Sequence, residues 1–283
     1  MKEDESKLCL IYYVVTERYE HYIPFFLYFL GKAYPNINTY IAIRQPLCGV
    51  VKDQMLPLVD NKNYKIEIEF QDYPIYSEFT KILRWIVRND HTDQFEYLYY
   101  GDIDIFIMKQ KPSLMESHLA RMNEFDTFYS NGTFTDIDGI EKMTGIHFCK
   151  RKEWYNAIWP TLVKYRDKIR KTGRIPEEFN NPITKKFTNL WAFTKMVEEA
   201  GIPITKGLWL GTSGLHLGNS REPGYWKILF NPHSQANDQI NFFRTFRSLI
   251  KNDIVFNKLL ELTIKEIREE IKLMIEEGNK YIR

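Results

Sequence analysis

Asp102 and Asp104 are the residues of this sequence that are best placed for chemistry. A hydrophobic run at residues 97–100 leads through Gly101 into the pair, and residues 105–107 are again apolar. Two carboxylates at positions i and i+2 lie on one face of an extended strand and can converge on one ion at its end. Such neighbouring acids repel each other near a core unless a cation compensates them, and their oxygens suit magnesium or manganese. The pattern predicts a metal site able to bind phosphate groups.

Two other interpretations of the pair are weaker. Strand-end aspartates can simply cap a turn, but this does not explain the apolar residues on both sides. Haloacid-dehalogenase-like phosphoryl-transfer enzymes also have Asp-x-Asp after a strand, with Thr or Val two residues beyond the second Asp. Here that position is Phe106, and the motif lies a third of the way along the chain instead of near its start. Both departures weigh against that family.

The segments that must position the pair alternate between strand and helix. Strands are expected at residues 8–15, 38–43, 64–70 and 97–100, and helices at residues 22–30 and 77–88. Residues 8–15, 22–30 and 38–43 form a strand-helix-strand (βαβ) unit, whose crossover is expected to be right-handed. The alternation predicts an α/β fold with a mostly parallel central sheet and flanking helices, Rossmann-like in arrangement. Ligands of such sheets bind at the carboxyl ends of the strands, where Thr16 and the two aspartates fall.

The second half of the chain is less regular. A strand is expected at residues 145–149, a helix at 185–200 and a glycine-rich loop at 208–221. From Phe242 onward, apolar residues recur at three- and four-residue steps between Glu and Lys, which is a helical pattern. We expect a main domain over residues 1–240 and a C-terminal helical extension over residues 241–283, with one long helix at 252–281.

Composition excludes several classes of protein. Lys and Arg number 39 against 37 Asp and Glu, so the formal charge is +2, far from the dense basic surface of a nucleic-acid binder. The three cysteines (Cys9, Cys48, Cys149) show no zinc-ligand spacing and are expected to be free thiols. No apolar run reaches the length of a membrane span. We expect a cytoplasmic protein, whose C-terminal helix packs internally or forms a homodimer; Glu among its basic residues disfavours peripheral membrane contact.

The strand with the Asp pair resembles the metal motif of GT-A glycosyltransferases, and the chain is similar to their retaining bacterial, family-eight-like members. Residues 12–35 resemble the first strand and helix of that fold, where the nucleoside binds. Residues 80–85 resemble the helix before the motif, whose basic residue reaches the donor. The resemblance implies that the donor is contacted by Tyr13, Val15, Thr16, Tyr19, Lys81 and Arg84, with Arg84 preferred over Lys81 as the basic residue.

A fourth segment, residues 214–226, resembles the family's His-x-x-Gly-x-x-Lys-Pro-Trp motif loosely. His216 and Gly218 are one residue closer together than in the motif, and Arg221 replaces the lysine. The resemblance implies that His216 ligates the metal and that Gly218 and Arg221 contact the diphosphate. The chemistry is reasonable, because neutral imidazole is a metal ligand, glycine permits close approach, and arginine forks onto phosphate oxygens.

The expected strand at residues 145–149 resembles one that faces the sugar and acceptor, although an ordinary core strand explains it equally well. An inverting enzyme would need a general base near the acceptor. The available groups are His147, Asp136, Asp138 and Glu141, and no feature of the sequence ranks them firmly. A retaining enzyme needs no such base, and the segment of His216 and Arg221 favours retention.

The resemblance implies a metal-dependent glycosyltransferase that uses Mn²⁺ or Mg²⁺ and a UDP-sugar, with a saccharide or lipid-linked glycan as acceptor, as in polysaccharide biosynthesis. The residues expected to act in catalysis are Asp102, Asp104, Arg221 and His147. One rival is a metal-dependent phosphohydrolase or nucleotidyltransferase that uses the same aspartates. Another is a non-catalytic carbohydrate-binding protein, although the intact Asp102, Asp104 and His216 argue against it.

Overall fold

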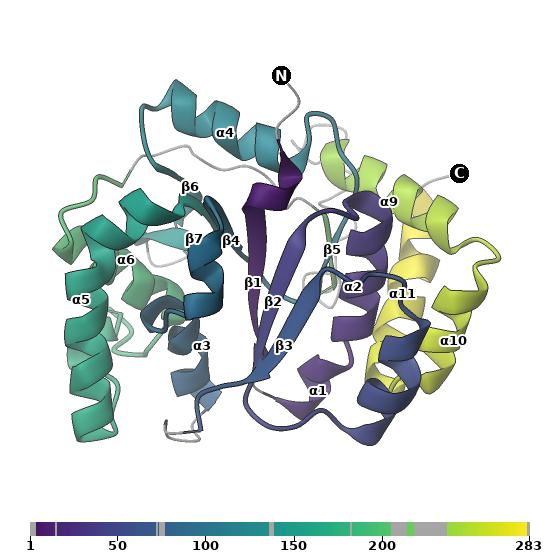
Figure 1. The fold of residues 1–283 in the computed structure, drawn as a ribbon, viewed down its shortest axis with the longest axis horizontal. Coiled ribbons are helices and arrows are strands. Elements are labelled where there is room, and N and C mark those ends of the chain that lie inside the picture. The colour runs from purple at the N-terminus through teal and green to yellow at the C-terminus, as the bar shows by residue number, and fades with distance from the viewer. Residues whose placement is uncertain are drawn as a thin grey trace.

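A computed structural model describes residues 4–14, 16–71, 73, 77–135, 139–181, 183–204, 214–217 and 237–281 of the chain. A central sheet lies between two groups of helices (Figure 1). It has six strands in the order β3-β2-β1-β4-β7-β6. Their bounds are β1 Leu8–Val14, β2 Asn38–Ile43, β3 Tyr64–Ile68, β4 Tyr97–Tyr100, β6 Tyr129–Thr135 and β7 Glu141–Lys150.

Four neighbouring strands, β3, β2, β1 and β4, are parallel, and β7 is the one strand of this sheet that runs in the opposite direction. β1 lies between β2 and β4, with Leu10 opposite Thr39 on one side and Tyr99 on the other. β7 pairs antiparallel with both β4 and β6. All seven residues of β1 are apolar and nearly all are buried, as expected for a strand covered on both faces. The predicted α/β class with a mostly parallel sheet is confirmed.

The helices cover the two faces of the sheet as separate groups (Figure 1). One face is covered by α2 (Ile23–Ala33) and the C-terminal helices, and the other by α3 (Ser77–Ile86), α5 (Arg151–Thr172) and α6 (Asn189–Glu199). The remaining helical elements are α1 Glu17–Glu20, α4 Leu114–Glu124, η1 Glu5–Lys7, η2 Val50–Met55, η3 Leu56–Leu58, η4 Asp90–Gln94 and η5 Glu177–Phe179. In the part of the chain that is described, no helix is long and apolar enough to cross a bilayer.

A second, two-stranded sheet lies beyond the end of β4. β5 (Ile105–Ile107) pairs antiparallel with β8 (Gly214–His216), so that Ile105 lies opposite His216. The glycine-rich stretch at 208–221 was expected to be a loop, and its residues 214–216 are instead a strand. Gly214 is needed there, because a Cβ at this position would lie 2.1 Å from the carbonyl oxygen of Phe106. This small sheet joins the chain after β4 to the segment that carries His216.

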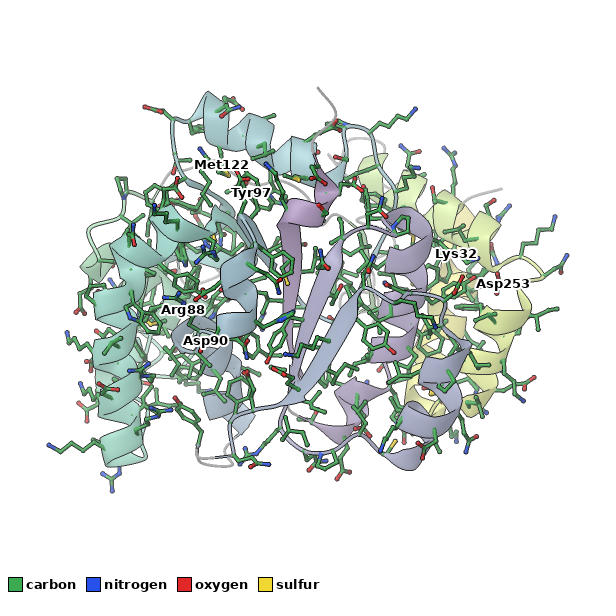
Figure 2. The ribbon with its side chains drawn as sticks, in the orientation of Figure 1. Lys32, Arg88, Asp90, Tyr97, Met122 and Asp253 are labelled. Atoms are coloured by element: carbon green, nitrogen blue, oxygen red, sulfur yellow. The ribbon has the colours of Figure 1, made fainter. Side chains whose placement is uncertain are left out.

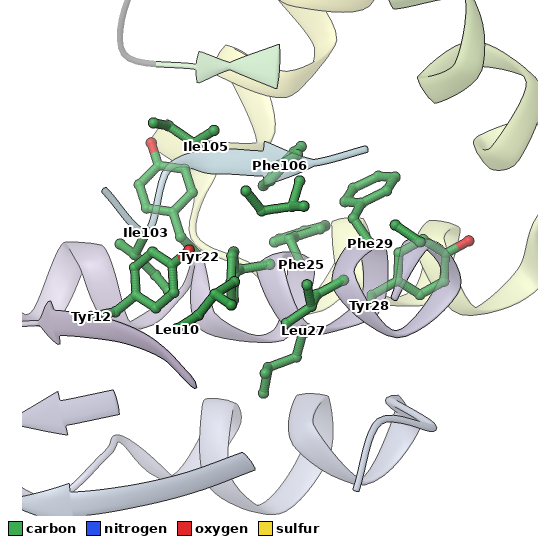
Figure 3. Packing of buried hydrophobic residues seen from close by; sticks show 14 of the residues in the cluster. Leu10, Tyr12, Tyr22, Phe25, Leu27, Tyr28, Phe29, Ile103, Ile105 and Phe106 are labelled. Carbon is green, nitrogen blue, oxygen red and sulfur yellow. The ribbon is translucent and has the colours of Figure 1, made fainter. Parts of the chain in front are cut away.

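The C-terminal residues are part of the same core as α2 and the central sheet. α9 (Asn237–Ile250), α10 (Ile254–Leu262) and α11 (Lys265–Tyr281) place Phe246, Phe256 and Ile271 in this core. On α2, Phe25 and Phe29 stack on Phe106 of β5 with ring centroids 6.1 and 4.7 Å apart; Figure 3 shows these three rings together.

The C-terminal tail is divided into two helices where one long helix over 252–281 was predicted. α10 ends at Leu262, and the backbone of the next residue, Thr263, is extended. The Arg268 guanidinium donates hydrogen bonds to the carbonyl oxygens of Leu260, Glu261 and Thr263. These bonds satisfy carbonyls that a helix end leaves unpaired. Asp253, at the N-cap of α10, also pairs with Lys32 of α2 at 3.4 Å (Figure 2).

Candidate active site

A cavity of about 400 Å³ lies at the carboxyl ends of β1 and β4, and it gathers most of the predicted site residues. It is lined by Tyr13, Thr16, Tyr19, Lys81, Arg84, Gly101, Asp102, Ile103, Asp104, Gly145, Asn189, Leu190 and His216. These residues come from well-separated parts of the chain. The position agrees with the rule that ligands of parallel sheets bind beyond the carboxyl ends of the strands.

A tight turn brings both aspartates to this cavity. β4 ends at Tyr100, and the backbone N–H of Ile105 donates to the carbonyl of Asp102 at 3.1 Å. The two aspartates therefore reach the cavity through a turn, and not as neighbours on an extended strand as the sequence predicted. Gly101 allows the chain to pass the core, because a Cβ there would lie 2.8 Å from the Tyr99 ring. Asp104 is 5% exposed, so its carboxylate is buried.

Pairing of the two short strands places His216 beside Asp104. The N–H of Leu217 donates to the carbonyl of Asp104 at 3.0 Å, next to the paired residues Ile105 and His216. As a result, His216 Nε2 lies 3.5 Å from Asp104 Oδ1. The fold thus brings His216 next to Asp104, although the two residues are more than a hundred positions apart in the sequence.

Arg84 lies on the other side of Asp102. Its Nη1 donates to Asp102 Oδ1 at 2.7 Å, and both side chains are partly buried. Gly145 of β7 completes this wall, where a Cβ would lie 3.4 Å from Asp102 Oδ2 and 3.6 Å from Arg84 Nη1. Lys81, one turn earlier on α3, is exposed and also lines the cavity.

The donor set of this cavity fits a hard divalent cation. Two carboxylates and an imidazole offer the oxygen and nitrogen ligands that manganese accepts, and the carboxylate of Asp104 is buried beside the imidazole. Asp102 is turned toward Arg84, so the three side chains do not meet at one point. Among the described residues, three donor atoms within 4.8 Å of one another occur elsewhere, at Glu20, His21 and Cys48.

The residues that were predicted to contact the nucleoside are only partly within the described structure. Tyr13, Thr16 and Tyr19 line the cavity. Tyr13 also packs on Phe70, with ring centroids 5.3 Å apart, and burial raises the pKa of its hydroxyl well above 10, so the ring is neutral. Val15, Gly218, Arg221, Asp136 and Asp138 lie outside the described residues. Glu141 begins β7 and does not line the cavity.

His147 does not reach the cavity, and the structure gives it no catalytic place. It lies on the same strand as Gly145 but is fully buried, with its ring 4.1 Å from Trp154 and 5.3 Å from Phe193. Asn131 contacts its Nδ1 at 3.3 Å, and its Nε2 has no hydrogen-bond partner. Burial lowers its pKa to about 3. His147 is therefore better explained as a core residue of an ordinary strand, the other explanation that the sequence allowed for residues 145–149.

Two buried histidines should make the protein acid-sensitive. Burial lowers the pKa of both His118 and His147 from 6.5 to about 3. The unfolded chain therefore takes up these protons first, and the free energy of unfolding falls as the pH drops from 6.5 toward 3, by about 1.4 kcal/mol per pH unit for each histidine. His147→Phe keeps an aromatic ring and should remove about half of this slope. Urea unfolding across this pH range measures it; an unchanged slope would contradict the assignment.

Asn189 and Leu190 line the cavity and were missed from the sequence. They are the first two residues of α6, whose N-cap Thr188 accepts a hydrogen bond from the N–H of Trp191 at 3.2 Å. The predicted helix began at residue 185 and placed both in its interior. The Thr-Asn pair is a usual helix start, and recognising it would have moved the helix N-terminus to this position.

No protein-family model and no curated protein matches the chain. Two solved structures of the galactosyltransferase LgtC, one in complex with donor and acceptor sugar analogues and one an active-site mutant, have TM-scores of 0.38 and 0.37, with 10% and 11% identity; each match covers 89% of this chain and 99% of that chain. A 4-diphosphocytidyl-2C-methyl-D-erythritol synthase from Anaerococcus prevotii has a TM-score of 0.37 and 12% identity, covering 56% of this chain and 75% of that chain.

Proposed function

We propose that this chain is a metal-dependent glycosyltransferase of the GT-A type, which transfers a sugar from a UDP-sugar to a saccharide or lipid-linked glycan acceptor. The observation that carries the proposal is the convergence of Asp102, Asp104, His216 and Arg84 on one cavity at the carboxyl ends of parallel strands. Acidic side chains can bind a cation and a neighbouring basic side chain can bind phosphate oxygens, so this combination suits a phosphate ligand that carries a cation. A fold of this kind supports many activities, so the proposal depends on the site.

Each group of the cavity then has a separate task. Asp102, Asp104 and His216 hold Mn²⁺ or Mg²⁺, and this cation would neutralise charge on the departing diphosphate. Arg84 and Lys81 bind phosphate oxygens, with Arg84 held in place by Asp102 until the donor arrives. Tyr13, Thr16 and Tyr19 border the nucleoside. We include retention of the anomeric configuration in the proposal, because the segment that contains His216 and Arg221 resembles the motif of retaining enzymes.

The proposal is tested by screening nucleotide sugars for a rise in melting temperature, with and without manganese. A ligand that binds the native state raises the melting temperature by mass action. We expect a manganese-dependent rise with a UDP-sugar and, with a suitable acceptor, release of UDP and a glycosylated product. Release of a nucleoside monophosphate or pyrophosphate would instead identify a phosphohydrolase or nucleotidyltransferase. Sugar binding that needs neither metal nor nucleotide would identify a carbohydrate-binding protein.

Replacing Arg84 with methionine should change metal and donor affinity in opposite directions. The guanidinium lies 2.7 Å from Asp102 Oδ1 and competes with a cation for this carboxylate. Arg84→Met should therefore bind manganese more tightly in the absence of nucleotide. It should bind the nucleotide sugar about 10- to 100-fold more weakly, because a hydrogen bond to a charged group contributes about 1.5–3 kcal/mol.

Calorimetric titration with manganese alone and then with the donor measures both effects. Arg88→Met is the matched control, since Arg88 follows the same helix but pairs with Asp93 at 2.5 Å and does not line the cavity. Weaker manganese binding in Arg84→Met would show that Arg84 supports the metal site and does not compete with it.

A further inference from the structure

We infer that Glu20, His21 and Cys48 form a second metal site, for a borderline cation such as Zn²⁺, separate from the proposed manganese site. Their ligand atoms all lie within 4.8 Å of one another. They border a different cavity, of about 660 Å³, which is also lined by Arg18, Gln45 and Glu266. Glu20 and His21 come from the end of α1, and Cys48 precedes η2.

The distance between sulfur and nitrogen suits one tetrahedral ion. Cys48 Sγ and His21 Nε2 are 3.8 Å apart. Zinc bonds of about 2.3 Å to sulfur and 2.0–2.1 Å to nitrogen, at tetrahedral angles, place these two atoms about 3.6 Å apart. Carboxylate oxygen is the third common zinc ligand, and Glu20 supplies it. Water can take the fourth position, and Glu266 of α11 lies in the same cavity.

The polar groups of this cluster lack adequate partners in the described structure. Glu20 is 4% exposed, and its carboxylate accepts long hydrogen bonds of 3.3 and 3.4 Å from the N–H of Cys48 and also lies beside the Cys48 thiol. His21 is 6% exposed, and its Nε2 faces the Cys48 sulfur at 3.8 Å. Burying a carboxylate without a counter-charge is costly. A cation would compensate Glu20 and accept the imidazole lone pair together.

Neighbouring charges do not oppose a cation here. Arg18 lines the cavity, but its guanidinium is paired with Glu270 of α11. Glu266 lines the same cavity and adds negative charge. The mixture of thiolate, imidazole and carboxylate favours zinc over magnesium or calcium, which require oxygen ligands alone.

Such an ion would also support the candidate active site. Tyr19, next to Glu20 on α1, lines the cavity that contains Asp102. An ion coordinated by Glu20, His21 and Cys48 would fix α1 to the segment after β2. The second site would therefore hold one wall of the first without contacting the substrate.

The experiment is a titration of the metal-free full chain with Co²⁺, followed by Zn²⁺. Bound cobalt gives a thiolate-to-metal charge-transfer band that reports a sulfur ligand directly. Cys9 and Cys149 are fully buried in strands, so the band would report Cys48. We expect the band to reach saturation at one cobalt for each Cys48 site, to disappear on adding Zn²⁺, and the melting temperature to rise with Zn²⁺.

Three variants test which side chains bind the ion. Cys48→Ser should abolish the band and weaken zinc binding at least about 100-fold, since loss of a supporting neighbour already costs 10- to 100-fold. Glu20→Gln, which keeps the thiol, should retain the band with weaker affinity. Asp104→Asn should bind cobalt at this site as the wild type does, because it belongs to the other cavity. No band with folded wild-type protein at excess cobalt, or a band that persists in Cys48→Ser, would overturn the inference.

Discussion

Asp104→Asn is expected to lower the rate of sugar transfer by about 100- to 1000-fold. The carboxylate is 5% exposed and lies 3.5 Å from His216 Nε2, so it is the best enclosed of the proposed metal ligands. The amide has nearly the same shape but no negative charge and would hold the cation poorly. The loss is comparable to that of one preorganised electrostatic group in an enzyme active site. The manganese-dependent rise in melting temperature should disappear as well.

Stability distinguishes this effect from damage to the fold. Without metal, Asp104→Asn should still unfold in one cooperative transition with the wild-type circular dichroism spectrum before melting, because the amide has nearly the same shape as the carboxylate. Asp93→Asn is the matched control. That carboxylate pairs with Arg88 and Arg151 at 2.5 and 3.1 Å, outside the cavity, and its loss should leave transfer unchanged. Full transfer activity in Asp104→Asn would show that the site has been assigned wrongly.

The parallel strands were predicted well from the sequence, because strands that are buried on both faces consist of apolar and β-branched residues. β2 was predicted with its observed limits, Asn38–Ile43, since its apolar and β-branched residues pack on both sides. α5 was not predicted: its 22 residues include Pro160 and many charges, and its apolar residues form only one narrow stripe. The second sheet was also not predicted, because three-residue strands leave too short a pattern.

The site was predicted as a set of residues, but its geometry was not. Side chains far apart in sequence meet in one cavity because parallel strands end at the same edge of the sheet, and this follows from topology. The turn after Gly101, the pairing of Asp102 with Arg84 and the burial of His147 depend on tertiary packing. Glu20, His21 and Cys48 share no local motif, because Cys48 is brought to α1 by the segment after β2. Such a cluster is visible only in the folded chain.

Phe256→Ala is expected to destabilise the entire protein by about 3–5 kcal/mol, the usual cost of removing a buried phenylalanine ring. Phe256 is 2% exposed and lies in α10, in the stretch predicted as a C-terminal extension. Its ring centroid is 5.9 Å from Phe25 and 6.0 Å from both Phe29 and Phe246. These rings also contact Phe106 of β5, which directly follows the Asp102–Asp104 turn.

A cooperative unit is therefore expected to extend from the C-terminal helices to the metal motif. Phe256→Ala should shift one single unfolding transition, seen equally by far-UV circular dichroism and by tryptophan fluorescence. All tryptophans precede residue 237, so their fluorescence reports the rest of the chain. Ile254→Ala is the matched control in the same helix: Ile254 is 84% exposed, and its loss should change stability by less than about 0.5 kcal/mol. If Phe256→Ala melted the C-terminal helices first and left the fluorescence transition in place, residues 241–283 would be a separable extension, and the position of Asp104 would not depend on them.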